Sequence, residues 1–432
     1  MAQAVGNQSP RRFDYKRTFI VGFGFLGISL IWPIFNQFIP LFLQAGNPQF
    51  EAQLLAEGKE IPLVAGFGLA PSLALFIMTW DNLINVFVQP WVGAKSDRTW
   101  NRWGRRKPWI LAGAPLAVIG FVLIPLVPTD WKFAGVVATA VFILITNFGM
   151  ALFRSPTVAW LGDLFPPDDR SKANGIINLM GGLGTVLALV AGGILFDKIG
   201  RAAPFVAGAA LMVIACVVVL KWVQEPEKIQ ISDKADAGVL ANLRHIWQDP
   251  NRSGLFVLVG ILFWFMAYEA LNTGMSSFAV FTLGIPAGRA ATLSAVAGLA
   301  FLVFAIPAGL LGTRFGRRPV IMVGLIGLTL VFLVSYFLIQ SATTFAIALV
   351  LTGMFWAAVN VNSLPLVYDY GDEQRIGAYT GLYYFSSQSA SVLGPTLGGV
   401  MVDVLGDQYR WLFLFSTLFM ALAWLAMMRV KK

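Results

Sequence analysis

The sequence predicts an all-α membrane protein of twelve transmembrane helices in two six-helix bundles, and three observations lead to this prediction. Of the 432 residues, 57% are hydrophobic and only 12% are charged, and the mean hydropathy is +0.72. A soluble globular protein carries about 25% charged residues because its surface faces water, so lipid must surround much of this chain. The other two observations are apolar stretches of about 20 residues, the length that crosses a bilayer, and an internal repeat.

Twelve apolar stretches follow one another along the chain. They lie near residues 17–44, 66–93, 109–128, 133–160, 173–197, 202–223, 253–282, 288–312, 319–340, 343–368, 378–402 and 408–429. The first is too long for the core of a cleaved signal peptide, so we interpret it as a retained span. An even number of spans places both termini on one side. Most of the 31 Lys and Arg residues fall on that side, which predicts cytoplasmic N- and C-termini in the cell (inner) membrane.

The longest polar interval divides the chain into two parts. It covers residues 224–252, is rich in charge and poor in large apolar side chains, and is interpreted as a cytoplasmic linker. The sequence therefore predicts an N-terminal bundle over residues 1–223 and a C-terminal bundle over residues 253–432.

An internal repeat supports this division. Residues 175–200 match residues 381–406 at a constant offset of 206 positions, and the same offset relates Asp163 to Asp369. Apolar helices resemble one another by composition alone, but the matched glycines and loop acids favour a true repeat. Two similar six-helix halves are typical of transporters that work by alternating access, with the site between the halves at mid-membrane.

The composition also excludes several classes of function. Cys216 is the only cysteine and His245 the only histidine, which excludes an intrachain disulfide, histidine metal clusters and histidine triads. The glycine-rich run at 181–184 lies within a span and no lysine directly follows it, so it is no phosphate-binding loop. The sequence therefore predicts no enzyme activity, cofactor or metal. The basic residues form short clusters between spans, so we expect no nucleic acid partner, but a small solute, protons and lipid, and a monomer.

A gate on the cytoplasmic side is predicted from the loop between the second and third spans. Residues 87–110 read FVQPWVGAKSDRTWNRWGRRKPWI, and a shorter echo, FGRRP, lies at 315–319. A glycine permits close helix contact, and arginines can bridge to acids at neighbouring helix ends. The arginines could instead serve topology alone, but an acid within a basic loop favours a gate. The gate residues are Gly93, Asp97, Arg98, Arg105, Arg106, Asp163, Arg317 and Asp369.

The same stretch carries a family resemblance. Its Gly-x-x-x-Asp-Arg motif and Gly-Arg-Arg cluster resemble the cytoplasmic signature of the major facilitator superfamily. The whole stretch is similar to the plant sucrose transporters and their animal and bacterial relatives, as are SLIWPIFNQFIP in the first span, RSPTVAWLGDL in the fourth and DDRSKANG after it. The resemblance covers the first half well and the second half weakly. It implies a sugar–proton symporter, for a disaccharide such as sucrose or maltose.

The sequence departs from these families in two places, and the second departure bears on the coupling ion. The plant transporters place an essential arginine two residues after the fourth-span proline, where this chain has Val158, and the nearest arginine is Arg154. The loop is also similar to that of the melibiose-type carriers, whose second span has two carboxylates for sodium. Asn85 and Gln89 align with those carboxylates, which disfavours sodium coupling.

Three ionisable residues lie within the predicted spans: Asp81, Arg154 and Glu269. A charge inside the membrane is costly unless it is paired or faces water, so each is a candidate functional residue. Burial in an apolar cavity favours a protonated carboxyl. Our hypothesis is that Asp81 or Glu269 carries the coupling proton and that Arg154 exchanges partners during transport. The alternative is a static Asp81–Arg154 ion pair that only holds the helices in register.

Sugar sites present aromatic faces to the sugar ring and amides to its hydroxyls. Trp32 is one candidate of these types. The others are Asn36, Gln37, Asn85, Gln89, Asn147, Trp264, Tyr268, Asn272, Trp356, Asn360, Asn362 and Gln388. The sequence thus favours a secondary symporter for a sugar or glycoside. An efflux antiporter for amphipathic organic molecules, a carrier of another solute, a channel and a membrane glycosyltransferase are the alternatives.

Overall fold

The computed structural model describes residues 13–225, 252–369 and 376–430. Within these ranges the regular structure is helical, apart from a single bridge between Asn101 and Gly104. The N-terminal half contains α1 (Tyr15–Gln44), α2 (Pro48–Ala56), α3 (Pro71–Met78), α4 (Trp80–Arg98), α5 (Lys107–Leu123), η1 (Ile124–Leu126), η2 (Thr129–Trp131), α6 (Phe133–Leu164), α7 (Pro167–Lys198) and α8 (Ala203–Trp222). The C-terminal half contains α10 (Ser253–Ser277), η3 (Phe278–Thr282), α11 (Ala287–Phe315), α12 (Arg317–Leu338), α13 (Ala342–Asp369), α14 (Ile376–Val404) and α15 (Trp411–Met428).

Eleven helical segments of the described chain are long and apolar enough to cross a membrane. Helices α3 and α4 together make one of these segments, Pro71–Arg98. The twelfth span is α14, which has 29 residues but carries several serines and Gln388, so it is less apolar. It packs against α10 within the C-terminal half and against α3 across the two halves. The prediction of an all-α protein with twelve spans is confirmed, and α2 is an additional short helix between the first two spans.

The second span is interrupted where its first intramembrane charge lies. Helix α3 ends at Met78 and α4 begins at Trp80, with Thr79 between them. The Thr79 hydroxyl donates a hydrogen bond of 2.7 Å to the carbonyl of Phe76, and so satisfies a carbonyl at the end of α3. Transporters commonly place broken helices beside their binding sites because the free backbone groups there face a cavity. The break lies two residues before Asp81.

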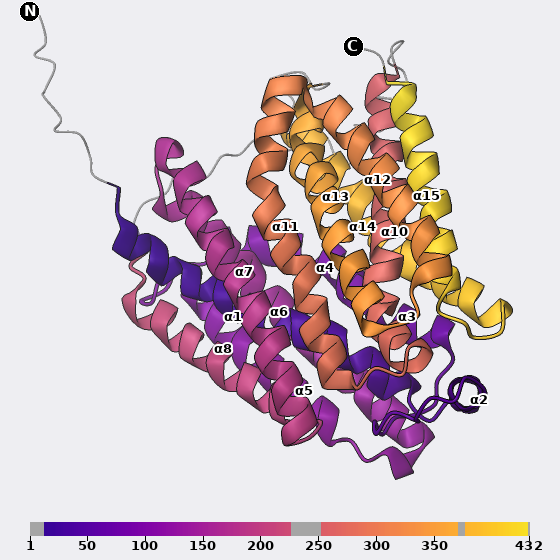
Figure 1. Ribbon diagram of the computed structural model, residues 1–432. Helices are drawn as coiled ribbons and strands as arrows, with labels where there is room; N and C mark the ends of the chain where they lie inside the picture. Colours follow the sequence, from indigo (N-terminus) through magenta and orange to yellow (C-terminus); the bar gives the residue numbers. More distant parts are fainter. Residues whose placement is uncertain (1–12, 226–251, 370–375, 431–432) are drawn as a thin grey trace, which may run out of the picture.

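The two halves meet at one end of the molecule and diverge at the other. We call the end where α1 begins and α15 ends the terminal face, and the end where α1 ends and α15 begins the far face. In Figure 1 the N-terminal half (indigo to magenta) and the C-terminal half (orange to yellow) approach each other near α2 and α3 and separate toward the two termini. The closest helix pairs across the halves are α7 with α11, α3 with α14 and α1 with α10.

Hydrogen bonds between the halves close the far face. At its centre the Gln44 side chain donates to the Ser277 hydroxyl at 3.0 Å and accepts from the Tyr409 hydroxyl, and all three side chains are fully buried. The Phe50 ring of α2 stacks on Phe281, with 5.0 Å between ring centroids. The structure is therefore closed at the far face.

Candidate functional site

Two adjoining chambers lie between the halves. The first, of about 270 Å³, is lined by residues of α1, α7, α10, α11, α12 and α13. The second, of about 330 Å³, is lined by residues of α1, α3, α4, α10, α13 and α14. Asn36 of α1 and Asn272 of α10 line both chambers. Asp81, two residues after the break between α3 and α4, lies in the wall of the second chamber.

The first chamber combines aromatic faces with amides and hydroxyls. Of the predicted residues, Trp32, Asn36, Gln37, Tyr268 and Asn272 line it; Thr185, Ser294 and Thr352 also line it and were not predicted. The Tyr268 ring stacks on Trp356 with 3.8 Å between ring centroids and 3° between ring planes. Trp356 is buried and therefore supports Tyr268 from behind. No charged residue is among the lining residues.

The Gln37 side chain is a buried donor group at the wall of this chamber. Its amide nitrogen has no hydrogen-bond partner among the described residues. Buried polar atoms in folded proteins are nearly always hydrogen-bonded, so this amide needs a partner from water or a solute.

The second chamber brings together one carboxyl group from each half. Asp81 accepts a hydrogen bond of 3.0 Å from the Asn82 amide, and Glu269 accepts one of 3.4 Å from the Asn272 amide. The other polar lining residues are Asn36, Thr273, Asn360, Tyr383, Tyr384, Ser387, Gln388 and Ser391. Asn82, Thr273, Tyr383, Tyr384 and the serines were not predicted. For the residues with hydroxyl groups, a hydroxyl in an apolar helix gives no sequence signal that separates it from a packing residue.

Arg154 lies on α6, where its charge interacts with Asp81 and with Tyr384 of α14. The ion pairs of the described residues do not include a direct Asp81–Arg154 pair. In this conformation the arginine and the acid are electrostatic neighbours without a closed salt bridge.

Six predicted substrate residues lie outside the lining of both chambers, and Trp356, which stacks behind Tyr268, is one of them. Asn85 and Gln89 continue along α4 from Asp81 and are partly buried. Asn147 and Trp264 are buried in helix packing. The Asn362 amide donates to the backbone carbonyls of Ala308 and Ala358 at 3.1 and 3.0 Å. Asn362 therefore joins α13 to α11 as a packing residue.

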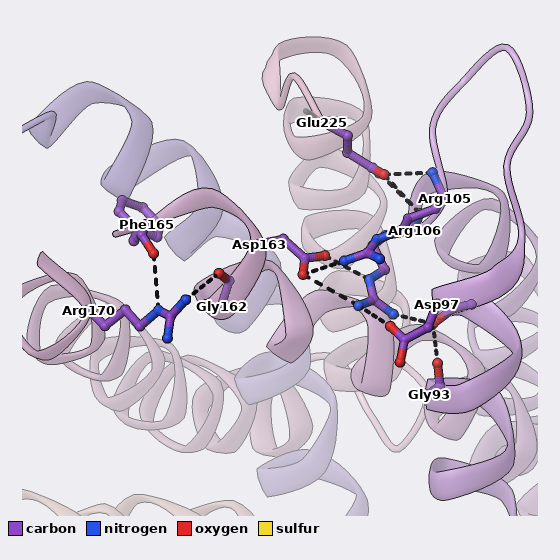
Figure 2. Close-up of polar contacts among 10 residues, drawn as sticks. Gly93, Asp97, Arg105, Arg106, Gly162, Asp163, Phe165, Arg170 and Glu225 are labelled. Atoms are coloured by element: carbon purple, nitrogen blue, oxygen red, sulfur yellow. Dashed lines mark hydrogen bonds and ion pairs between the residues drawn. The ribbon is translucent and has the colours of Figure 1, made fainter. Parts of the chain in front are cut away.

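The terminal face of the N-terminal half carries a charged cluster, shown in Figure 2. Asp163, at the end of α6, accepts from Arg105 Nη2 at 2.6 Å and from Arg106 Nε at 2.9 Å. Asp97, at the end of α4, pairs with Arg106 at 2.5 Å. A Cβ atom on Gly93 would lie 3.4 Å from the Ser155 hydroxyl, an ordinary van der Waals contact, so the approach of α4 to α6 does not require a glycine there.

Glu225 belongs to this cluster although no sequence pattern points to it. Its carboxylate accepts from the backbone N–H groups of Arg105 at 2.7 Å, Arg106 at 3.0 Å and Lys107 at 3.0 Å (Figure 2). These donors lie at the start of α5, where N–H groups have no partner within the helix. Glu225 therefore caps α5 from the end of the first half.

The C-terminal half carries a simpler arrangement. Arg317 pairs with Asp369 and donates to the carbonyl of Pro365 at 3.2 Å. Both members of this pair are partly exposed. Arg98 is exposed and takes part in none of the ion pairs of the described residues. Each predicted gate acid thus pairs with arginines of its own half.

Comparisons with known proteins agree with this architecture. Over 153 residues the chain is 31% identical to "Proton-associated sugar transporter A" of Mus musculus, a match that covers 33% of this chain and 20% of that protein. Over 143 residues it is 32% identical to "Sucrose transport protein SUC4" of Arabidopsis thaliana, a match that covers 30% and 28%. The chain thus matches less than a third of the length of these relatives.

Solved structures match almost the whole chain. A mutant form of the nucleoside transporter NupG matches with a TM-score of 0.72, 13% identity and coverage of 96% of this chain and 100% of that one. The D-xylose-proton symporter matches with a TM-score of 0.66, 15% identity and coverage of 96% and 97%. At such identities the likeness shows the fold alone.

The family model of the Major Facilitator Superfamily matches residues 18–301 and 281–432, which together span nearly the whole chain. With twelve spans in two halves, the chain belongs to the Major Facilitator Superfamily and is a multi-pass membrane transporter and not an enzyme.

Proposed function

We propose that this transporter carries a sugar or glycoside, such as a disaccharide, together with protons across the cell membrane, as a monomer. The observation that carries the proposal is the pair of adjoining chambers, one aromatic and uncharged, the other with a carboxyl group from each half. A neutral polyol and a proton each find a matching environment there.

The first chamber has the chemistry of a sugar site. The free face of Tyr268, backed by Trp356, offers an apolar platform for the C–H face of a sugar ring. The Gln37 amide and the shared amides Asn36 and Asn272 offer hydrogen bonds to hydroxyls. The names of the mouse and plant relatives point to sugars as well.

Coupling is proposed to pass through Asn272. This residue lines the first chamber and donates to Glu269 in the second. A sugar hydroxyl that takes the Asn272 amide changes the hydrogen bonding of Glu269, and thereby its preference for a proton. Arg154 then interacts with whichever nearby acid stays charged. By thermodynamic linkage, the proton must in turn change the affinity for the sugar.

The test is uptake of a labelled disaccharide panel, including sucrose and maltose, into proteoliposomes with an imposed inward proton gradient. We expect accumulation that collapses with the gradient. Lack of uptake of any sugar, with protons or with sodium, would overturn the proposal. Export of amphipathic dyes would instead favour an antiporter.

The acids are tested by Asp81→Asn and Glu269→Gln. The variant that loses the coupling proton should abolish uphill accumulation while sugar exchange across the membrane persists, and its uptake should no longer decline as pH rises. Asp130→Asn, an exposed acid in the loop before α6, is the matched control. Unchanged accumulation in both cavity variants would contradict the coupling assignment.

A further inference from the structure

Two acids on the far face bind helix starts of the opposite half. Asp197, near the end of α7, accepts a hydrogen bond of 2.9 Å from the backbone N–H of Gly288 in the first turn of α11. Asp403, near the end of α14, accepts one of 3.0 Å from the backbone N–H of Ser72 in the first turn of α3. Each acid is the penultimate residue of its helix, and each donor is the second residue of its helix.

The two contacts are related by the internal repeat. Asp403 lies 206 positions after Asp197, which is the offset between residues 175–200 and 381–406. The donors lie on the second spans of the two halves, α3 and α11. The contact from the first half to the second is thus matched by one from the second half to the first.

A pair of glycines at the same offset allows both contacts. A Cβ atom on Gly193 would overlap the carbonyl oxygen of Gly288, and one on Gly399 would lie 2.8 Å from Cα of Ser72. Any larger residue at either position would hold the helix ends apart. The glycine and the acid four residues later therefore act together, one turn of helix apart.

The chemistry of these contacts suits repeated making and breaking. The first N–H groups of a helix lack intrahelical partners and carry partial positive charge, so a carboxylate stabilises them. Asp197 is exposed and Asp403 is partly exposed. When the halves separate, water can therefore hydrogen-bond to each carboxylate and to each freed N–H group. Release does not leave an unpaired charge in an apolar interior, which would be costly.

We propose that Asp197 and Asp403 form a symmetric pair of latches that hold the far face closed, and that both release when the transporter opens to that side. The latches lie on the same face as the neutral contact formed by Gln44, Ser277 and Tyr409. They act on the conformational equilibrium of the empty transporter, independently of which solute it carries.

The test measures far-face distances in the purified full-length protein without solute. Spin labels are placed on the exposed far-face residues Trp131 and Gln340, one in each half, in a Cys216→Ser background. Pulsed electron paramagnetic resonance then reports the populations of closed and open far faces.

We expect Asp197→Ala and Asp403→Ala each to raise the open-to-closed ratio about fivefold, the usual effect of losing a helix cap. The double variant should combine the two effects, because the contacts join different pairs of helices and share no partner. Asn variants keep an acceptor oxygen and the fold, and should shift the ratio less than Ala.

Two results would overturn the proposal. One is an unchanged distance distribution in the double Asn and double Ala variants. The other is a shift in only one single variant, which would contradict a symmetric pair. Because the measurement needs neither sugar nor proton gradient, failure of the proposed transport function would leave its outcome unaffected.

Discussion

The two halves carry the same arginine pair on the terminal face but surround it differently. In the N-terminal half, Arg105 and Asp163 have side-chain exposures of 5% and 11%. In the C-terminal half, the repeat-related Arg317 and Asp369 have exposures of 38% and 44%. The same motif is thus buried in a network in one half and exposed to water in the other.

The second arginine of each pair shows the same difference. Arg106 bonds to Asp97 and Asp163, whereas Arg318 donates to the backbone carbonyls of Met427 and Met428 at 3.1 and 3.2 Å. Arg318 therefore caps the end of α15, a favourable place for a cation. Repeated sequence preserves the position of these residues, but burial determines what each contact contributes to stability.

The largest expected effect is that of Asp163→Asn. The change leaves Arg105 and Arg106 buried beside a neutral amide, and breaking a buried ion pair from one side costs about 3 kcal/mol. The measurement is the free energy of unfolding of the purified protein in detergent. A loss below about 1 kcal/mol would mean that water already screens this cluster.

Gly104→Ala comes next, with Gly316→Ala as its matched partner in the other half. Both glycines have positive φ angles, +105° and +91°, which cost a non-glycine residue roughly 1 kcal/mol. Only at Gly104 would the new Cβ also approach the Glu225 carboxyl, at 2.7 Å. We therefore expect Gly104→Ala to lower the thermal unfolding temperature clearly more than Gly316→Ala. Equal losses would show that Glu225 moves aside freely.

Glu225→Gln should have a smaller effect. The amide keeps one acceptor oxygen but loses the negative charge that three N–H groups at the start of α5 share. A charge at a helix start contributes about 0.5–1 kcal/mol. Hydrogen–deuterium exchange should therefore rise at residues 105–110 and stay unchanged at 317–322. Unchanged exchange at both sites would contradict a stabilising role of the Glu225 charge at the start of α5.

These residues also show which features of the structure can be predicted from the sequence. The twelve spans and the pairing of Asp163 with Arg105 and Arg106 follow from apolar length and from an acid at a helix end, which are local signals. The role of Glu225 cannot be predicted from such local signals. It depends on a contact with a residue about 120 positions away, and Glu225 lies in a polar segment that contains several acids.

The cavity shows the same limit. Asp81 and Glu269 stand out because charge is rare in a span, and both line one chamber. Asn362 has the same residue type as Asn360, yet it packs on α11 because helix rotation turns it away from the chamber. No proline or glycine adjoins the break at Thr79, so the sequence gives no signal for it. Side-chain direction and helix breaks of this kind depend on tertiary packing, which a single sequence does not display.

The smallest expected effect is that of Asp369→Asn, the repeat counterpart of Asp163→Asn. Its ion pair with Arg317 is open to water, and exposed pairs contribute at most about 1 kcal/mol. Arg317 also keeps its hydrogen bond to the carbonyl of Pro365, so the link between α12 and α13 persists. We expect the free energy of unfolding to fall by about 0.5 kcal/mol or less, and this loss to vanish at high salt, which screens exposed charges. A loss as large as that of Asp163→Asn would mean that the two halves hold their arginines equally firmly, and that burial does not set the difference between them.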